Sequence, residues 1–179
     1  MGSTWVFVTS NSNKWQEAQR ILGHALERAE LSLEEVQADT VAAVALAKAR
    51  VAYARLQRPV IVEDAGLELG ALGGFPGPFI KYWEQLGGLA SICRAADGLG
   101  DRSVRAVCAL GICSERGADV VVGSVDGLVS LQPRGHQGFG WDAIFVPHGD
   151  GRTFGEMSAA EKDAQSHRRR AWELLRDRL

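Results

Sequence analysis

Short apolar runs alternate with segments of helical periodicity in the first third of the chain. Residues 5–9 (WVFVT) and 60–63 (VIVE) are rich in β-branched residues and predict two buried strands. Asp39 and Thr40 can cap an Ala-rich helix that extends to about Leu56. An earlier helix, after a polar turn, is predicted by apolar residues at helical spacing: Trp15, Ala18, Leu22, Ala25, Leu26 and Ala29. This order of strand, helix, helix and strand predicts an α/β domain.

The later part of the chain continues the mixture of strands and helices. The Gly- and Pro-rich stretch from Ala65 to Pro78 predicts a structured loop, because helical sequence resumes at Phe79. The remaining predicted elements are a hairpin of residues 102–114 and 118–131, a strand at 143–147 (AIFVP), a short helix opened by the capping box of Ser158 and Glu161, and an amphipathic tail from Arg168. No internal repeat or linker interrupts this order, so we expect one domain over residues 1–179.

Composition and charge exclude several classes of protein. The chain has 179 residues, 46% of them hydrophobic, and a net charge of −2, which excludes a disordered chain and a broad basic face for nucleic acid. No apolar run approaches the roughly 20 residues of a membrane span, and no charged segment followed by an apolar stretch marks a secretory signal. Three cysteines without a CxxC pair argue against a disulfide framework. We therefore expect a cytoplasmic protein that binds neither nucleic acid nor a membrane.

Lysine is scarce in this chain. Of the 20 basic residues, 16 are arginine and four are lysine, namely Lys14, Lys48, Lys81 and Lys162. We interpret this bias as the use of arginine wherever a diffuse surface charge suffices. The four lysines are therefore candidates for positions that need a compact ammonium group, such as a phosphate contact.

Three segments carry candidate chemistry. In residues 9–14 (TSNSNK), backbone N–H groups at a helix start and a lysine beside them suit a phosphate, although an ordinary capped helix has the same residues. Glu63 and Asp64 follow a buried strand, where active groups of open α/β sheets collect. Two adjacent carboxylates repel each other, and Mg²⁺ would relieve that repulsion. The alternative is a solvated strand end with Asp64 holding a turn.

The third segment combines residues 138–142 (GFGWD) with residues 166–168 (SHR). An aromatic side chain between glycines can support a planar base, and the SHR triplet supplies donors for carbonyl oxygens. A packed turn and a solvated helix start are the alternative interpretations. No GxSxG motif is present, which argues against a serine nucleophile. Taken together, the three segments predict a nucleotide site with phosphate, metal and base positions.

At these residues the sequence resembles the inosine triphosphate pyrophosphatases, which act on non-standard purine nucleoside triphosphates. The matching blocks are VFVTSNSNK, VEDAGLELGALGGFPGPFIKYW, PRGHQGFGWDAIF and TFGEM…EKDAQSHRRRAW, which cover the chain almost end to end. The resemblance implies a mixed α/β fold with a long twisted central sheet, flanking helices and two lobes around a substrate cleft. It also implies a homodimer and Mg²⁺-dependent cleavage of ITP, dITP and XTP to the monophosphate and pyrophosphate, with Mn²⁺ as a substitute metal.

The resemblance also implies roles for individual residues. Asp64 would activate water, and Glu35, Glu63 and Asp64 would bind the metal, with Glu34 leaving the register of Glu35 uncertain by one. Lys14 would act in catalysis and in phosphate binding. The substrate-binding residues would be Thr9, Ser10, Asn11, Lys14, Lys48, Phe139, Gly140, Trp141, Asp142, Lys162, Ser166, His167 and Arg168.

Four residues depart from the family pattern. Ser10 replaces a glycine, and a positive φ there would cost roughly 1 kcal/mol or more. Asp163 replaces an asparagine, and its negative charge would weaken phosphate affinity. Ala65 replaces a serine or threonine, and Ala143 replaces a proline. None removes a predicted catalytic group. We expect a pyrophosphohydrolase for deaminated purine nucleotides; the alternatives are the same chemistry on other modified nucleotides and a nucleotide sensor without turnover.

Overall fold

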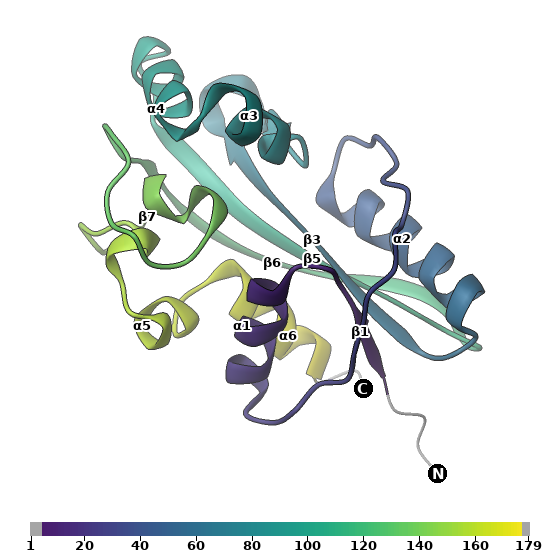
Figure 1. Cartoon of the computed structure of the whole chain (residues 1–179). Coiled ribbons are helices and arrows are strands. Elements are labelled where there is room, and N and C mark those ends of the chain that lie inside the picture. Colours follow the sequence, from purple (N-terminus) through teal and green to yellow (C-terminus); the bar gives the residue numbers. More distant parts are fainter. Residues whose placement is uncertain (1–4, 177–179) are drawn as a thin grey trace.

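The structure, a computed structural model, describes residues 5–176, in which seven strands form one mixed sheet and six α-helices lie against it (Figure 1). The strands are β1 (Val6–Val8), β2 (Arg28–Ala29), β3 (Val60–Leu69), β4 (Pro76–Gly77), β5 (Ser103–Ser114), β6 (Gly117–Val129) and β7 (Phe145–Pro147). The α-helices are α1 (Ser12–Leu22), α2 (Val41–Leu56), α3 (Ile80–Gly87), α4 (Leu89–Gly98), α5 (Ala159–Asp163) and α6 (His167–Arg176). Three 3₁₀ helices are η1 (Gly70–Leu72), η2 (Gly140–Ile144) and η3 (Phe154–Glu156). The predicted mixed α/β fold is confirmed.

The sheet has the order β2-β1-β3-β5-β6-β7, with β4 paired to β3. β1 is parallel to β2 and to β3, whereas β3, β5 and β6 form long antiparallel ladders. β3 and β5 pair from Val60 opposite Cys113 to Leu69 opposite Val104. The predicted hairpin of residues 102–114 and 118–131 is confirmed as β5 and β6.

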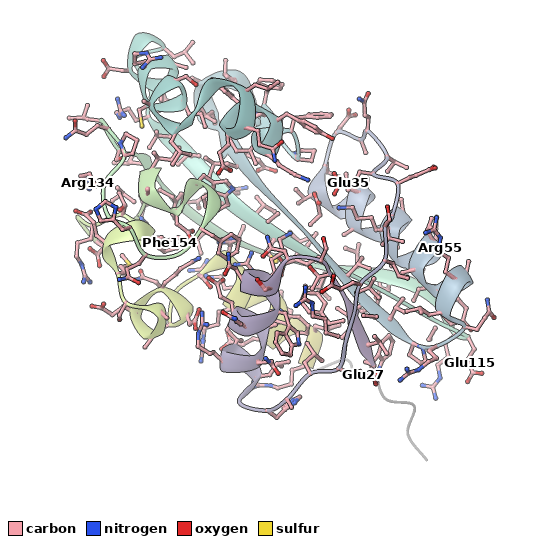
Figure 2. All side chains as sticks on the ribbon, in the orientation of Figure 1. Glu27, Glu35, Arg55, Glu115, Arg134 and Phe154 are labelled. Carbon is pink, nitrogen blue, oxygen red and sulfur yellow. The ribbon has the colours of Figure 1, made fainter. Side chains whose placement is uncertain are left out.

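Three hydrophobic clusters divide the molecule into two lobes. In the first lobe, α2 packs on one face of the sheet and α1 and α6 pack on the other. In the second lobe, α3, α4, η2 and η3 pack around the far ends of β3, β5 and β6. Figure 2 shows Glu35 beside α2 in the first lobe and Phe154 in the second. The long strands connect the lobes.

The first helix is shorter than its periodicity predicts. Gly23 has φ 73° and ends α1 after Leu22, with its N–H bonded to the carbonyl of Gln19. Because a left-handed residue reverses the chain direction, the apolar positions at Ala25 and Ala29 leave the helix. Arg28 and Ala29 form β2 instead.

The prediction that a strand ends at Glu63 is wrong. β3 continues to Leu69, so the segment predicted as a loop begins with five residues of strand. β1 ends at Val8, opposite Val62, and within the described residues β3 has no partner strand on this side from Glu63 until β4 pairs with Leu67 and Glu68. The acidic pair therefore lies in mid-strand, where the neighbouring strand stops.

Two smaller differences concern the second lobe. α4 has no counterpart among the predicted elements. The strand predicted at 143–147 begins at Phe145, because residues 140–144 form η2. The capping box of Ser158 and Glu161 and the helix ends near Thr40 and Leu56 agree with prediction. In the described part of the chain, no helix has the length and apolar character needed to cross a membrane.

Candidate active site

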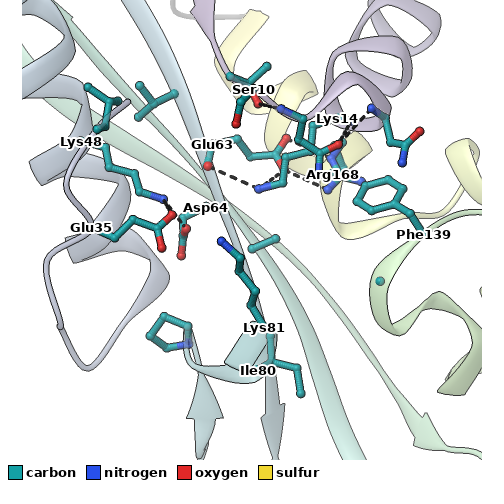
Figure 3. A pocket seen from close by; sticks show the side chains of 18 of the residues that line it. Ser10, Lys14, Glu35, Lys48, Glu63, Asp64, Ile80, Lys81, Phe139 and Arg168 are labelled. Carbon is teal, nitrogen blue, oxygen red and sulfur yellow. Dashed lines mark hydrogen bonds and ion pairs between the residues drawn. The ribbon is translucent and has the colours of Figure 1, made fainter. Parts of the chain in front are cut away.

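A cleft of about 840 Å³ lies between the two lobes (Figure 3). It opens where β1 ends and β3 continues, so the strand exit of β1 and the middle of β3 form its floor. The start of α3 and residues 139–142 belong to the second lobe and also line it. The cleft thus brings together residues that are more than 150 positions apart, from Val8 to Arg168.

The turn after β1 forms one end of the cleft. Asn11 caps α1, and its side-chain oxygen accepts the N–H groups of Asn13 and Lys14 at 3.0 and 3.1 Å. The N–H of Asn11 donates to the hydroxyl of Thr9 at 3.1 Å. Among the described residues, Gln57 is the one non-glycine with positive φ. The strain expected at Ser10 is therefore absent, and Ser10 fits the turn with ordinary backbone angles.

A lysine and two carboxylates, which we call the open cluster, lie on the α2 side of the cleft. The Nζ of Lys48 is 2.6 Å from Glu35 and 2.9 Å from Asp64. Burial raises the pKa of Asp64, opposed by Lys48. Burial also acts to raise the pKa of Glu35, but Lys48 holds it below its usual value. Glu35 lines the cleft and Glu34 is not among its lining residues, so Glu35 is the better placed of the two for the predicted metal contact.

Glu63 and Asp64 do not share a cation in this structure. Successive residues of a strand point to opposite faces, and these two carboxylates accordingly have different partners. Both oxygens of Glu63 accept from Arg168, at 2.9 and 3.0 Å, and Lys14 lies 3.4 Å away. Burial alone would raise the pKa of Glu63, but Arg168 and then Lys14 hold it below its usual value. The predicted repulsion between adjacent acids is wrong, because the strand separates them.

The Glu63–Arg168 pair belongs to a larger buried set, the closed network, which comprises Glu17, Glu63, Asp142, Lys162 and Arg168. Arg168 also donates to Glu17, and Lys162 donates to Glu17 at 2.7 Å and to Asp142 at 2.5 Å. The side chains of the network are at most 5% exposed. Buried charges are stable only when they are paired and hydrogen-bonded, and here each carboxylate accepts from at least one basic group.

Aromatic rings cover the closed network on the cleft side. The Phe139 ring lies 4.8 Å from Lys162 Nζ and 5.2 Å from the Arg168 guanidinium. Asp142 accepts the N–H of Phe139 at 2.7 Å, which fixes the start of η2. Gly140 has φ 62°, a conformation that suits glycine. This segment is therefore held rigidly at the end of the cleft opposite the open cluster.

His167 lies in this aromatic wall. Its ring centroid is 5.1 Å from Trp141 and 6.3 Å from Phe154, and the residue is 1% exposed. Neither ring nitrogen has a hydrogen-bond partner in residues 5–176. Burial, reinforced by Arg168, holds the pKa of His167 well below its usual value. The imidazole is therefore neutral at pH 7, and its N–H is buried in the wall of the cleft without a partner among the described residues.

Two predicted substrate-binding residues do not line the cleft. Ser166 is fully buried, and its hydroxyl accepts the N–H of Arg169 at 3.1 Å as part of the start of α6. Lys162 is 2% exposed and is bound by two acids of the closed network. Both residues hold the wall in place. The other predicted substrate-binding residues line the cleft: Thr9, Ser10, Asn11, Lys14, Lys48, Phe139, Gly140, Trp141, Asp142, His167 and Arg168.

The residue roles implied by the resemblance omit two residues of this region. Lys81, at the start of α3, lines the cleft, and Figure 3 shows its ammonium pointing toward Asp64. The scarcity of lysine had made it a candidate for a phosphate contact, although the resemblance assigned it no role. Glu17 gives no such signal, because an acidic residue within an amphipathic helix is ordinarily solvated. Arg20 pairs with the carboxylate of Asp163 at 2.7 Å, which offsets its charge, and the effect of Asp163 on phosphate affinity stays a prediction.

Comparisons with known proteins agree with this geometry. A model of the Ham1 family matches residues 5–178. The chain is 41% identical over 177 residues to an inosine triphosphate pyrophosphatase of Batrachochytrium dendrobatidis, covering 96% of this chain and 92% of the relative. It is 38% identical over 169 residues to a dITP/XTP pyrophosphatase of Hyperthermus butylicus, covering 93% and 89%.

Solved structures of related proteins also resemble this chain. The Ham1 protein of Staphylococcus aureus superposes with a TM-score of 0.83 over 97% of both chains at 24% identity, which shows the fold. A nucleoside-triphosphatase / dITP/XTP pyrophosphatase of Mycobacterium abscessus has a TM-score of 0.76 at 30% identity, covering 96% of this chain and 98% of that one. The chain belongs to the Ham1 family.

Proposed function

We propose that this protein hydrolyses the noncanonical purine nucleoside triphosphates ITP, dITP and XTP to the monophosphate and pyrophosphate. Relatives that match over most of the chain are named for these activities. The observation that carries the proposal is the order of groups along one cleft. The ammonium groups of Lys48 and Lys81 lie on the side of the cleft that holds the open cluster. Aromatic rings, with an imidazole that has no hydrogen-bond partner among the described residues, lie on the other side, next to Lys14 and the capped start of α1. A nucleotide has the same order of charged phosphates and planar base.

The open cluster fits a divalent cation. Glu35 and Asp64 both direct an oxygen to the Nζ of Lys48, so their carboxylates converge on one positive charge. In the described residues, no group of three acidic, His or Cys side chains converges in this way. Mg²⁺ in phosphate-transfer sites is commonly held by one or two carboxylates together with the substrate phosphates. We propose that Glu35 and Asp64 hold Mg²⁺ or Mn²⁺, which would neutralise charge on the pyrophosphate.

The proposed reaction uses Asp64 as the base. Its raised pKa suits a group that accepts a proton from water. The oxygen of that water bonds to the α-phosphorus, the bond to the α,β-bridging oxygen breaks, and pyrophosphate leaves with the bonding electrons. Lys14, Lys48 and Lys81 carry compact positive charges around the cleft and would stabilise the phosphate oxygens.

Base selection is proposed for the aromatic wall. A purine would stack on Phe139, and its 6-oxo group would accept from His167 and Arg168. Arg168 uses three of its five N–H groups on Glu17 and Glu63, which leaves two. A guanidinium can only donate, so the 6-amino group of adenine would face a donor and be rejected.

Two alternatives remain distinct from this proposal. The same chemistry could serve other modified nucleotides, since the relatives' names and the cleft leave the preference among substrates open. A nucleotide sensor would bind ITP without releasing pyrophosphate.

The homodimer and the cytoplasmic location stay predictions. Light scattering would test the homodimer.

A turnover assay with ITP, dITP, XTP, GTP and ATP tests the proposal. We expect pyrophosphate release from the first three with Mg²⁺ or Mn²⁺, slow release from ATP, and loss of activity in excess EDTA. Ca²⁺ should support activity poorly, because its coordination geometry is looser. Tight ITP binding without pyrophosphate release would favour the sensor, and full activity in EDTA would contradict the proposed metal site.

A further inference from the structure

Arg28 lies directly behind the turn that follows β1. It comes from the two-residue strand β2, whose backbone pairs with β1 at Phe7 and Val8. The Nε of Arg28 donates to the carbonyl of Thr9 at 3.0 Å, and Nη2 donates to the carbonyl of Ser10 at 2.9 Å. One side chain thus binds two successive backbone carbonyls at the point where the ladder of β1 stops.

Other contacts fix the Arg28 guanidinium. It lies 5.7 Å from the centroid of the Trp15 ring, and Glu30 pairs with Nη2 at 2.6 Å. Trp15 is itself fixed, because its indole N–H donates to the carbonyl of Leu26 at 2.8 Å. The side chain of Arg28 is 20% exposed. A guanidinium held on three sides is a rigid anchor for the carbonyls that it binds.

The anchored carbonyls determine where the N–H groups point. In a trans peptide the C=O and the following N–H point in opposite directions. With the oxygens of Thr9 and Ser10 on Arg28, the N–H groups of Ser10 and Asn11 are directed away from it. The N–H of Asn11 donates to the Thr9 hydroxyl, so the N–H of Ser10 is the one that a ligand would meet. Ser10 and Asn11 line the cleft, whereas Arg28 is not among the described residues that do.

We propose that Arg28 is a positioning residue for phosphate binding. It withdraws two carbonyl oxygens, which would repel a phosphate, and orients the backbone N–H of Ser10 toward the ligand. This inference rests on the proposed function, because it concerns the same turn and the same triphosphate. It predicts a defect in phosphate affinity without a defect in the chemical step, since the contacts of Arg28 are with the turn, Trp15 and Glu30 and not with the open cluster.

Two substitutions and one control test the proposal. Arg28→Met keeps an unbranched stem against Trp15 and removes both hydrogen bonds, whereas Arg28→Lys keeps the charge but loses the fork that spans two carbonyls. Arg58→Met is the control: Arg58 pairs with Glu27, next to β2, through two 2.8 Å bonds and does not touch the turn. For each variant, kcat and KM for ITP, the inhibition constant of pyrophosphate, the binding of inosine and Tm are measured.

In Arg28→Met we expect KM for ITP and the inhibition constant of pyrophosphate each to rise about tenfold, with kcat changed less than about twofold. Arg28→Lys should show a smaller rise of the same kind, and it provides the test if Arg28→Met does not fold. Inosine, which lacks phosphates, should bind all variants equally, and Arg58→Met should match the wild type.

The proposal would be overturned if KM and pyrophosphate inhibition stay at wild-type values in the folded Arg28 variants, or if Arg58→Met shows the same change. It would also be overturned if inosine binding weakens as much as pyrophosphate binding, because Arg28 would then support the fold in general. A wild-type protein that releases no pyrophosphate from any nucleotide would instead contradict the proposed function, and pyrophosphate binding would still test Arg28.

Discussion

The two sides of the cleft hold similar charged groups, which differ in burial and in how completely their hydrogen bonds are satisfied. In the closed network, the Glu63 side chain is fully buried and both of its oxygens are bound by Arg168. In the open cluster, Asp64 and Glu35 are 14% and 40% exposed and share a single ammonium. The closed network is therefore suited to holding the cleft in shape. The open cluster has an excess carboxylate exposed to water and is suited to exchanging partners with a metal ion and phosphates.

The difference follows from the geometry of β3. Glu63 and Asp64 are adjacent, but alternation directs one toward α6 and the other toward α2. Each face then imposes its own environment, and the pKa of Glu63 is lowered while that of Asp64 is raised. Neighbouring acids with opposite pKa shifts are characteristic of a division between a structural role and a proton-accepting role.

The largest effect is expected from breaking the closed network. Arg168→Met would leave Glu63 and Glu17 buried with fewer partners, which should lower the free energy of unfolding by about 3–5 kcal/mol. Urea denaturation at pH 7 measures this change. The exposed pair of Arg58 and Glu27 supplies the control, because Arg58→Met should leave the denaturation midpoint unchanged. Equal midpoints for the two variants would mean that the network does not hold the wall.

The second-largest effect is expected on turnover, and it distinguishes the open cluster from the closed network. Asp64→Asn removes the proposed base but still allows an oxygen to accept from Lys48, so kcat for ITP should fall by about 10²-fold or more with little loss of stability. Glu68→Gln, four residues further along β3, is a matched control that should keep wild-type turnover. Near wild-type turnover in Asp64→Asn would show that water is activated by another group.

The smallest effect concerns His167 and pH. The unfolded chain binds a proton at this histidine below about pH 6.5, whereas the folded protein does so only at much lower pH. The unfolded state therefore binds more protons as pH falls, and stability is lost in that direction. Between pH 7 and 5.5 this single group should cost about 1 kcal/mol. His167→Phe, which fits between Trp141 and Phe154, should reduce the loss by that amount, and an unchanged pH profile would contradict the neutral imidazole.

Local patterns in the sequence predicted most of the elements correctly. The ends of α2, the β5–β6 hairpin and the capping box of α5 depend on residues within a few positions of one another. Most of the predicted site residues also gather in one cleft, because their motifs follow strand and helix ends that the topology brings together. The error in β3 arose because a distant partner decides the outcome. The extent of β3 depends on its ladder with β5, which pairs as far as Leu69.

The sequence by itself determined that this chain forms an α/β fold with residues suited to phosphate, metal and a planar base. Residue types and their periodicity are local properties, and they are sufficient for that conclusion. Only the tertiary structure decided what each charged group does. Glu63 and Arg168 are 105 positions apart, and burial gives their pairing its strength. Because burial and partner choice set whether a carboxylate is an anchor or a free ligand, Glu63 and Asp64, adjacent and alike in sequence, have different roles.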